Sequence, residues 1–192
     1  IFQVILTQQR GWKLEDRVLY KTAVCQFHQH AYKRMGETID RLRRTHRESN
    51  YVQDGDMLLA KAQAQQGHVN EAAASFTAII EAGDRHRKYA EALRQRGWLY
   101  EKHKQFDAAI GDYNRYLGEG HAPSRAIVHD TVMRLIDLYA RTDRHEKCLT
   151  TTRRLLDTNA TGNGTLLEPK VEQEALYRWA LAARKLRQHE QV

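Results

Sequence analysis

Apolar residues recur at spacings of three and four along most of this chain. The clearest example is 93-LRQRGWLYEKHKQFDAAIGDYNRYL-117, in which two such apolar stretches are separated by the polar pair Lys104-Gln105. This spacing places the apolar side chains along one side of an α-helix, and the polar pair is typical of a turn. The segment is therefore predicted to form two helices joined by a tight turn.

The same pattern occurs four times. Phe106 serves as a reference residue, with Gly97 nine positions before it and Ala109, Tyr113 and Tyr116 three, seven and ten positions after it. Moving back by 37 residues from Phe106 gives a second reference residue, Val69, and moving back by another 37 gives Tyr32. Moving forward by 39 residues from Phe106 gives His145. The residues at the matching positions are Ala60, Ala72, Phe76 and Ile79; Ala23, Met35, Ile39 and Leu42; and Ile136, Cys148, Thr152 and Leu155. Small residues let helix axes approach closely and large ones fill the layer between hairpins, so the pattern predicts four packed helical hairpins.

Turn-forming residues fall where this scheme needs them. Within hairpins they are Gln66-Gly67-His68, Lys104-Gln105 and Thr142-Asp143; between hairpins they are Arg47–Asn50, Gly83-Asp84, Gly118–Pro123 and Thr158–Pro169. The last segment, Glu168–Gln188, is predicted to be the first helix of a fifth hairpin or a capping helix, packed through Leu176, Trp179, Ala180, Ala183 and Leu186. The predicted organisation is residues 1–15 as the end of a preceding truncated unit or a cap, 16–162 as four hairpins, and 163–192 as a loop and a capping helix.

The third hairpin resembles a tetratricopeptide repeat. The residues that carry the resemblance are Leu93, Gly97 and Tyr100, followed by Ala109 and Tyr113. Other positions depart from the family pattern: Arg96 replaces a leucine, Asp56 and Gln63 stand where large apolar residues are usual, and the repeats are longer than the 34 residues of the family. The resemblance implies an all-α fold, a right-handed solenoid of antiparallel helix hairpins.

Composition supports a helical chain and excludes a membrane-spanning one. Among 192 residues there are only 2 prolines and 11 glycines, 41% are hydrophobic and 29% charged. No apolar run approaches the roughly 20 residues of a spanning helix. The chain begins at Ile1 rather than Met, which indicates a fragment or a processed form. Its two cysteines, Cys25 and Cys148, lie in apolar helical patterns and are expected to be buried free thiols. Cytoplasmic and bacterial periplasmic locations both stay open, with these thiols favouring the former.

The sequence contains no recognisable catalytic or cofactor motif. A phosphate-binding glycine loop, a zinc-protease motif and a nucleophile elbow are all missing from it. His28 and His30 are two positions apart, so on a helix they face away from each other and make a poor metal site. We therefore expect no enzyme activity, no metal and no cofactor. Asn159 and Asn163 begin glycosylation tripeptides within a predicted loop, a pattern that is also common by chance.

The net charge of +7 leaves nucleic-acid binding open as an alternative function. The basic runs are Arg41–Arg47, near the end of a predicted second helix, and Arg85–Lys88, in the linker after another. Cations at both places also stabilise the helix dipole. Neither run contains the aromatic residues on which bases would stack. A regulatory or sensor domain of a larger protein is the third interpretation.

The resemblance also implies where a partner would bind. In tetratricopeptide arrays the first helices line a concave groove that binds peptide segments. The matching positions here are Tyr20, Val24, Phe27, Met57, Lys61, Arg94, Trp98, Glu101, Met133 and Asp137. If the register is imperfect, some of these side chains belong to the core instead. Some tetratricopeptide domains bind the C-terminal carboxylate of chaperones with a clamp of lysines and asparagines at groove positions. The corresponding positions here are Val24, Lys61, Trp98 and Asp137, none of which is an asparagine, so the sequence argues against such a clamp. The predicted function is a scaffold that binds a protein or peptide segment, with self-association through the array ends as a further option.

Overall fold

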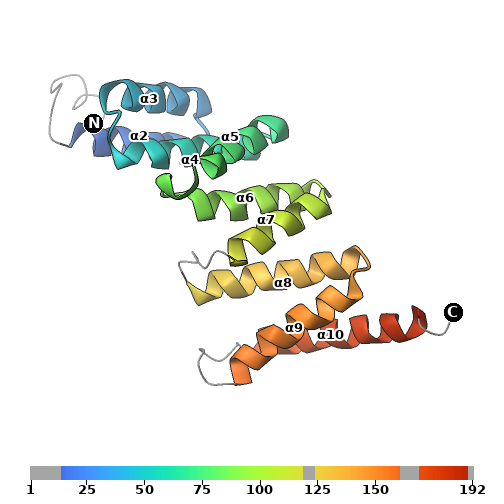
Figure 1. Ribbon diagram of the computed structural model, residues 1–192. Helices are drawn as coiled ribbons and strands as arrows, with labels where there is room; N and C mark the ends of the chain where they lie inside the picture. Colours follow the sequence, from blue (N-terminus) through green and yellow to red (C-terminus); the bar gives the residue numbers. More distant parts are fainter. Residues whose placement is uncertain (1–13, 119–123, 161–168, 190–192) are drawn as a thin grey trace. The chain divides into compact units, whose positions relative to one another are not determined.

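The computed structural model describes residues 14–118, 124–160 and 169–189, and within these ranges the chain is entirely helical (Figure 1). The described helices are α2 (Glu15–His28), α3 (Tyr32–Thr45), α4 (Asn50–Gln65), α5 (Val69–Glu81), the short 3-10 helix η1 (Gly83–Arg85), α6 (Tyr89–Lys102), α7 (Phe106–Gly118), α8 (Arg125–Arg141), α9 (His145–Ala160) and α10 (Pro169–His189). The prediction of an all-α fold built from successive helical hairpins is confirmed. Residues 1–13 of the predicted first segment and residues 119–123 of the predicted turn Gly118–Pro123 lie outside the described ranges.

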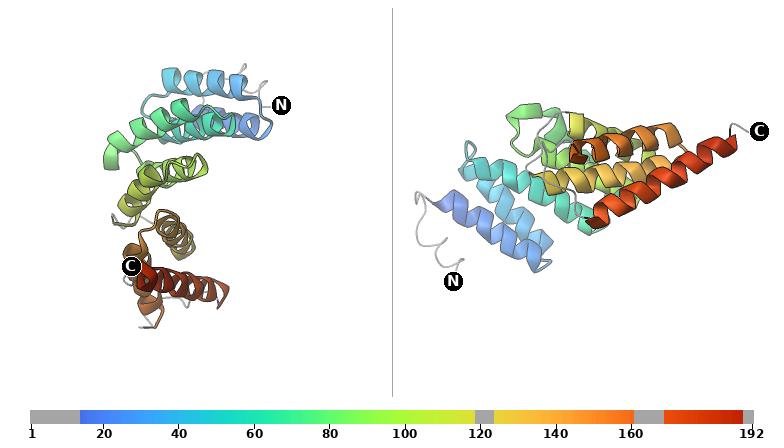
Figure 2. Two further views of the ribbon diagram at one scale, coloured as in Figure 1. Left: turned by 90° about the vertical axis from the view of Figure 1, so that its right-hand side faces the viewer. Right: turned by 90° about the horizontal axis from the view of Figure 1, so that it is seen from below.

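The chain divides into two compact units, Ile1–Leu99 and Tyr100–Val192. In the first unit α2 packs on α3 and α4 on α5, and α4 also contacts α2 and α3. In the second unit α8 packs on α7 and α9, while α10 packs on α9 and α8. Figures 1 and 2 show α2 beside α3 and α9 beside α10. In each unit, the first and second helices of hairpins therefore alternate along the chain.

The repeat register read from the sequence is the register of the structure. The four reference residues Tyr32, Val69, Phe106 and His145 are the first residues of α3, α5, α7 and α9. The small or branched residues nine positions earlier, and the residues three, seven and ten positions later, are all buried. In the first unit, for example, Ala23, Met35, Ile39 and Ala62 form one continuous core cluster. In the second unit the core joins Ala109 and Tyr113 of α7 to Ile136 of α8 and Cys148 of α9.

Each hairpin turn contains one residue in the left-handed region of backbone conformation. These residues are His30, Gly67, Lys104 and Asp143, with φ angles of 56°, 78°, 59° and 55°. Their positions repeat with the same spacing as the reference residues, each lying two residues before the second helix begins. Only one of the four is glycine, the residue that adopts this conformation without steric cost.

Three polar residues stand where the tetratricopeptide pattern has apolar ones, namely Asp56, Gln63 and Arg96, and each has a polar partner in the structure. The Ser75 hydroxyl donates a hydrogen bond to the side-chain oxygen of Gln63 (2.7 Å), and Thr38 donates to Gln26 at the matching position one hairpin earlier (2.9 Å). Arg96 donates to the Thr77 hydroxyl at 2.6 Å. Asp56 forms an ion pair with Arg43 at 2.5 Å. Hydrogen bonds and ion pairs thus replace apolar contacts at these positions, which lets half-buried polar groups keep partners.

Two sequence predictions are wrong at the ends of the described chain. Helix α10 packs through Ala175 and Ala182, which are buried, whereas Leu176 and Trp179 of the predicted packing stripe are exposed. Cys25 is exposed rather than buried, while Cys148 is buried as predicted. A third prediction is also wrong: the chain does not leave the helix at Thr158, because α9 continues to Ala160; residues 161–168 lie outside the described ranges.

The left-handed turn residue gives a direct test of the repeat. We expect Gly67→Ala to lower the free energy of unfolding by about 1 kcal/mol, because its φ of 78° is unfavourable for any residue with a Cβ atom. Gly36 lies within α3, and a Cβ added there would meet no atom within 4 Å. The control substitution Gly36→Ala should therefore raise the free energy of unfolding by roughly 0.5–1 kcal/mol. Urea denaturation followed by circular dichroism measures both; equal effects of the two substitutions would contradict the assignment.

Candidate partner-binding surfaces

In the first unit, the first helices of consecutive hairpins lie next to one another. Tyr20 of α2 stacks on Tyr51 of α4, with ring centroids 5.3 Å apart and planes inclined by 22°. Lys61 of α4 forms an ion pair with Glu91 of α6 at 2.6 Å. These contacts join α2, α4 and α6 into one layer, which we call the first-helix face; the residues that make its contacts include Tyr20, Tyr51, Asp54, Lys61, Lys88 and Glu91.

The first-helix face contains a chain of alternating charges. Lys88 lies 3.1 Å from Glu91 and 3.5 Å from Asp54, and Arg87 lies 3.2 Å from the other oxygen of Asp54. Asp54 is buried, and these two cations are its ion-pair partners. The result is a layer whose helices are connected by ion pairs at their solvent side rather than by apolar contacts alone.

These contacts shift the pKa values of the groups involved. Burial on its own raises the pKa of Glu91, but hydrogen bonds and attraction from Lys61 and Lys88 outweigh it, and the net pKa is lowered. Burial, and next the charge of Asp54, raise the pKa of the Tyr20 hydroxyl. Burial lowers the pKa of Lys88, yet Glu91 and Asp54 together raise it above its ordinary value. Glu91 and Lys88 are therefore held in their charged forms at neutral pH.

Helix α6 carries the most exposed aromatic residue of this layer. Glu91, Arg94 and Trp98 follow one another at intervals of three and four, so they share one side of the helix. Since Glu91 on that side pairs with Lys61, the same side belongs to the first-helix face. Arg94 is half-buried, and Trp98 remains 40% exposed.

The other predicted groove residues of the first unit differ in accessibility. Val24 and Phe27 are half-buried against the core cluster of α2, α3 and α4, and the Phe27 ring meets the edge of Tyr32. Met57 is only 2% exposed. The structure therefore places Met57 in the interior, whereas Tyr20, Lys61, Arg94 and Trp98 keep part of their surface accessible.

In the second unit, the predicted groove residues Glu101 and Asp137 are held by arginines from the following first helix. Glu101 accepts a hydrogen bond from the Tyr113 hydroxyl (2.8 Å) and pairs with Arg134 of α8 (3.2 Å). Asp137 of α8 pairs with Arg178 of α10 at 2.7 Å. Met133 is half-buried against the core of this unit. Ion pairs between consecutive first helices thus occur in both units, although in the first unit the cation, Lys61, lies on the earlier helix and the acid, Glu91, on the later one.

The basic runs of the sequence are largely engaged within the chain. Arg41 pairs with Glu15 at 2.7 Å and Arg43 with Asp56 and Asp40. In the second run, Arg87 and Lys88 both contact Asp54. Sequence reasoning did not identify most of these acidic partners, because Glu15, Asp54 and Asp56 lie far along the chain from their cations and on other helices.

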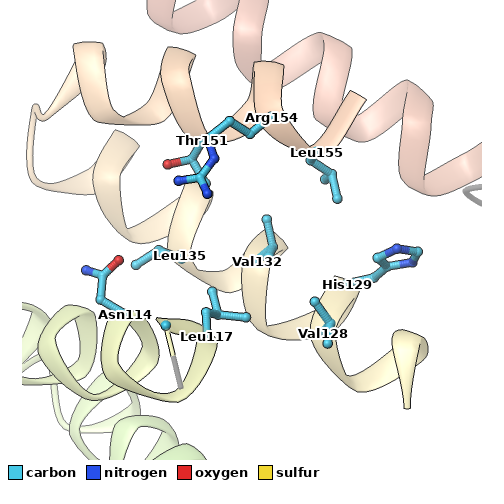
Figure 3. Close-up of a pocket in the computed structure, with 10 residues that line it drawn as sticks. Asn114, Leu117, Val128, His129, Val132, Leu135, Thr151, Arg154 and Leu155 are labelled. Atoms are coloured by element: carbon cyan, nitrogen blue, oxygen red, sulfur yellow. The ribbon is translucent and has the colours of Figure 1, made fainter. Parts of the chain in front are cut away.

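The second unit also contains a half-open cavity of about 380 Å³ between α7, α8 and α9 (Figure 3). Leu117, Val128, Val132, Leu135 and Leu155 give it an apolar lining, and Asn114, Thr151, Arg154 and His129 lie at its edges. Sequence analysis did not predict it, because its lining comes from three helices. Its apolar lining has room for an aliphatic side chain.

Among the described residues there is no group of three or more histidine, cysteine or acidic side chains that could hold a metal ion. Burial raises the pKa of the Cys148 thiol, which accordingly stays protonated at neutral pH. None of the helices in the described ranges combines the length and the hydrophobicity needed to span a membrane.

Comparison with known proteins identifies the fold. No family model and no curated protein sequence matches the chain. Solved structures do match: one described as a kinesin light chain from Podosopora anserina with nearly identical TPR-like repeats has a TM-score of 0.66 and 12% identity, and the match covers 95% of this chain and 92% of that one. A variant of the same Podosopora anserina protein matches with a TM-score of 0.64 and 14% identity, over 94% of this chain and 92% of that one. The apo form of RapI matches with a TM-score of 0.70 and 11% identity, over 92% of this chain and 50% of RapI. The chain therefore has the TPR-like repeat fold.

The ion pairs of Glu91 predict a pH-dependent contribution to stability. Because folding lowers the pKa of Glu91, its stabilising effect is present above the pKa of the unfolded chain and is lost as the pH falls through the folded value. We expect Glu91→Gln to destabilise the protein by about 1 kcal/mol at pH 7, with the difference shrinking toward about pH 3. Urea denaturation at both pH values measures this. The exposed Glu37→Gln serves as the control and should show little difference at either pH; a Glu91→Gln effect independent of pH would contradict the assignment.

Proposed function

We propose that this protein is a non-catalytic scaffold that binds a segment of another protein on the first helices of its hairpins. The TPR-like fold supports a protein-interaction role, and the absence of a catalytic or cofactor motif from the sequence agrees with it. The proposed contact residues are those predicted from the repeat register and accessible in the first unit: Tyr20, Val24, Phe27, Lys61, Arg94 and Trp98. Glu101, Met133 and Asp137 are the corresponding residues of the second unit.

The observation that carries the proposal is Trp98. Its side chain is 40% exposed on the side of α6 that also bears Arg94 and Glu91. Tryptophan and arginine are the residues that most often dominate binding energy in protein interfaces. A large aromatic side chain left accessible beside an arginine is thus better evidence for a partner site than the charges alone.

The chemistry of the first-helix face favours a partner segment with both apolar and charged side chains. Trp98 and Tyr20 offer aromatic surface, while Lys61 and Glu91 offer one cation and one carboxylate already paired with each other. A charged side chain of the partner can replace Lys61 or Glu91 in this ion pair. An extended or helical segment fits a layer of parallel helix surfaces. A chaperone-type carboxylate clamp is not part of the proposal, because the asparagine it needs is missing.

The test is a quantitative pull-down with Arg94→Ala/Trp98→Ala. We expect a reproducible set of partner proteins to be recovered at least about tenfold less well than with the wild-type chain, the effect of removing an interface hot spot. Lys33→Ala/Arg34→Ala provides the control, since both residues are exposed on the second helix α3. Circular dichroism confirms that both variants are folded. An unchanged set of partners with Arg94→Ala/Trp98→Ala would overturn the assignment of the first-helix face.

The alternative of nucleic-acid binding is tested in the same material. Binding to generic RNA or DNA through the basic runs would weaken steeply with salt, because each phosphate contact releases counterions. Since Arg41, Arg43, Arg87 and Lys88 already have acidic partners, we expect no salt-sensitive binding at physiological ionic strength. Salt-sensitive binding that is lost in Arg44→Ala/Arg47→Ala, two exposed cations of the first run, would favour the alternative.

A further inference from the structure

Both units of the chain contain a half-open cavity at the same place in the repeat. The first-unit cavity lies between α3, α4 and α5, and the second-unit cavity lies between α7, α8 and α9 (Figure 3). Each has a volume of about 380 Å³. Six lining positions of the two cavities have the same offsets from the reference residues of their hairpins. The two linings can therefore be compared position by position.

Two of the shared positions have the same apolar chemistry in both cavities. Leu59 and Leu135 each lie ten positions before the reference residue of the later hairpin. Ile79 and Leu155 each lie ten positions after it. These side chains give both cavities an aliphatic wall from α4 and α5 or from α8 and α9.

Two other shared positions differ in charge. In the first unit they are Arg43 and Asp56, which form an ion pair at 2.5 Å across the cavity lining. In the second unit the equivalent residues are Leu117, eleven positions after Phe106, and Val132, thirteen positions before His145. The second-unit cavity thus has two aliphatic side chains where the first-unit cavity has an ion pair.

The edge of the cavity differs in the opposite sense. Ala78 of α5 lines the first-unit cavity, and its equivalent in α9 is Arg154. Figure 3 shows Arg154 and Thr151 next to each other at the edge on the α9 side, and Asn114 at the edge on the α7 side. Asn114 is held there by a hydrogen bond from its amide nitrogen to the Tyr139 hydroxyl at 3.0 Å. The second-unit cavity therefore combines an aliphatic lining with a guanidinium at its edge.

This combination matches a molecule that has an aliphatic chain and one carboxylate. Small-molecule sites are typically cavities of about 300–1,000 Å³, mostly apolar, with a few polar groups that fix the orientation of the ligand. A guanidinium binds a carboxylate through two parallel hydrogen bonds. Because it has five N–H donors, Arg154 can bind a carboxylate while it keeps its contacts within the chain.

We propose that the second-unit cavity binds an aliphatic carboxylic acid of medium chain length. Its chain would lie against Leu117, Val132, Leu135 and Leu155, and its carboxylate would bind Arg154. The first-unit cavity does not bind it, because an aliphatic chain there would take the ion pair out of water without replacing its hydration. The proposed site shares no residue with the contact residues proposed for the scaffold, so this inference goes beyond that function.

The first test is isothermal titration calorimetry of the full chain with octanoate at pH 8, below the concentration at which micelles form. We expect saturable binding of one molecule per chain rather than two. From hexanoate to decanoate the affinity should rise about fourfold for each methylene group, as expected for burial of a hydrocarbon chain. The uncharged 1-octanol has the same chain length and should bind about tenfold more weakly or worse, because it cannot form the charge-assisted hydrogen bonds to Arg154.

Three variants locate the site. Leu117→Arg/Val132→Asp gives the second-unit cavity the ion pair of the first and should abolish octanoate binding. Arg154→Ala should weaken octanoate binding about tenfold or more and leave 1-octanol binding unchanged. Arg153→Ala is the matched control: this neighbouring arginine is also exposed on α9 but does not line the cavity, so binding of both compounds should stay as in the wild-type chain.

Circular dichroism checks that each variant is folded. Should Leu117→Arg/Val132→Asp unfold the second unit, Arg154→Ala decides alone, because residue 154 is exposed and the first unit has alanine at this position. Arg94→Ala/Trp98→Ala should bind octanoate like the wild-type chain. That result keeps the two proposals separate, since either can fail while the other stands.

Four outcomes would overturn the proposal. Octanoate could show no saturable binding, or it could bind at two or more sites per chain. It could also bind equally well to Arg154→Ala and Arg153→Ala, which would remove the carboxylate from the site. Equal affinities of octanoate and 1-octanol would show that the cavity takes an uncharged apolar group, such as an aliphatic side chain of a partner protein.

Discussion

A helix that begins a hairpin in this fold has two sides to bury, one against its own second helix and one against the hairpin before it. Close approach on both sides requires small residues at fixed positions, because helix axes can come together only where side chains are short. Gly55 shows how tight this is: a Cβ atom added there would lie 3.2 Å from Cγ2 of Ile39 in α3. The spacing of small residues along the chain, the length of the repeat and the placement of the turns all follow from this double packing.

The repeat could be predicted because packing within a hairpin is periodic. Each second helix begins at its predicted reference residue, since the small and large residues around it report contacts that recur every 37–39 residues. Partners of individual polar residues could not be predicted in the same way. Gln63 departs from the family pattern, and only the folded chain shows that Ser75 hydrogen-bonds to it from the facing helix.

The ends of the described chain show the limit of pattern reading. The spacing of apolar residues identifies a stripe on α10, but a sequence pattern does not show whether a facing helix is present. Cys25 illustrates the same point, because it is exposed in α2 whereas the equivalent residues Ala62 and Leu138 are buried in α4 and α8. Met57 is the converse case: a residue assigned to the binding surface lies in the interior. Periodicity gives the side of a helix, whereas exposure depends on which neighbours are there.

The different environments of the two cysteines also bear on how the molecule can be studied. Cys148 is enclosed in the core of the second unit, and burial raises the pKa of its thiol, so we expect it to react slowly with alkylating reagents. Cys25 is exposed on α2 and is the only other cysteine of the sequence. The unaltered chain thus offers a single attachment point for a dye or a spin label, at a defined position on the first described helix.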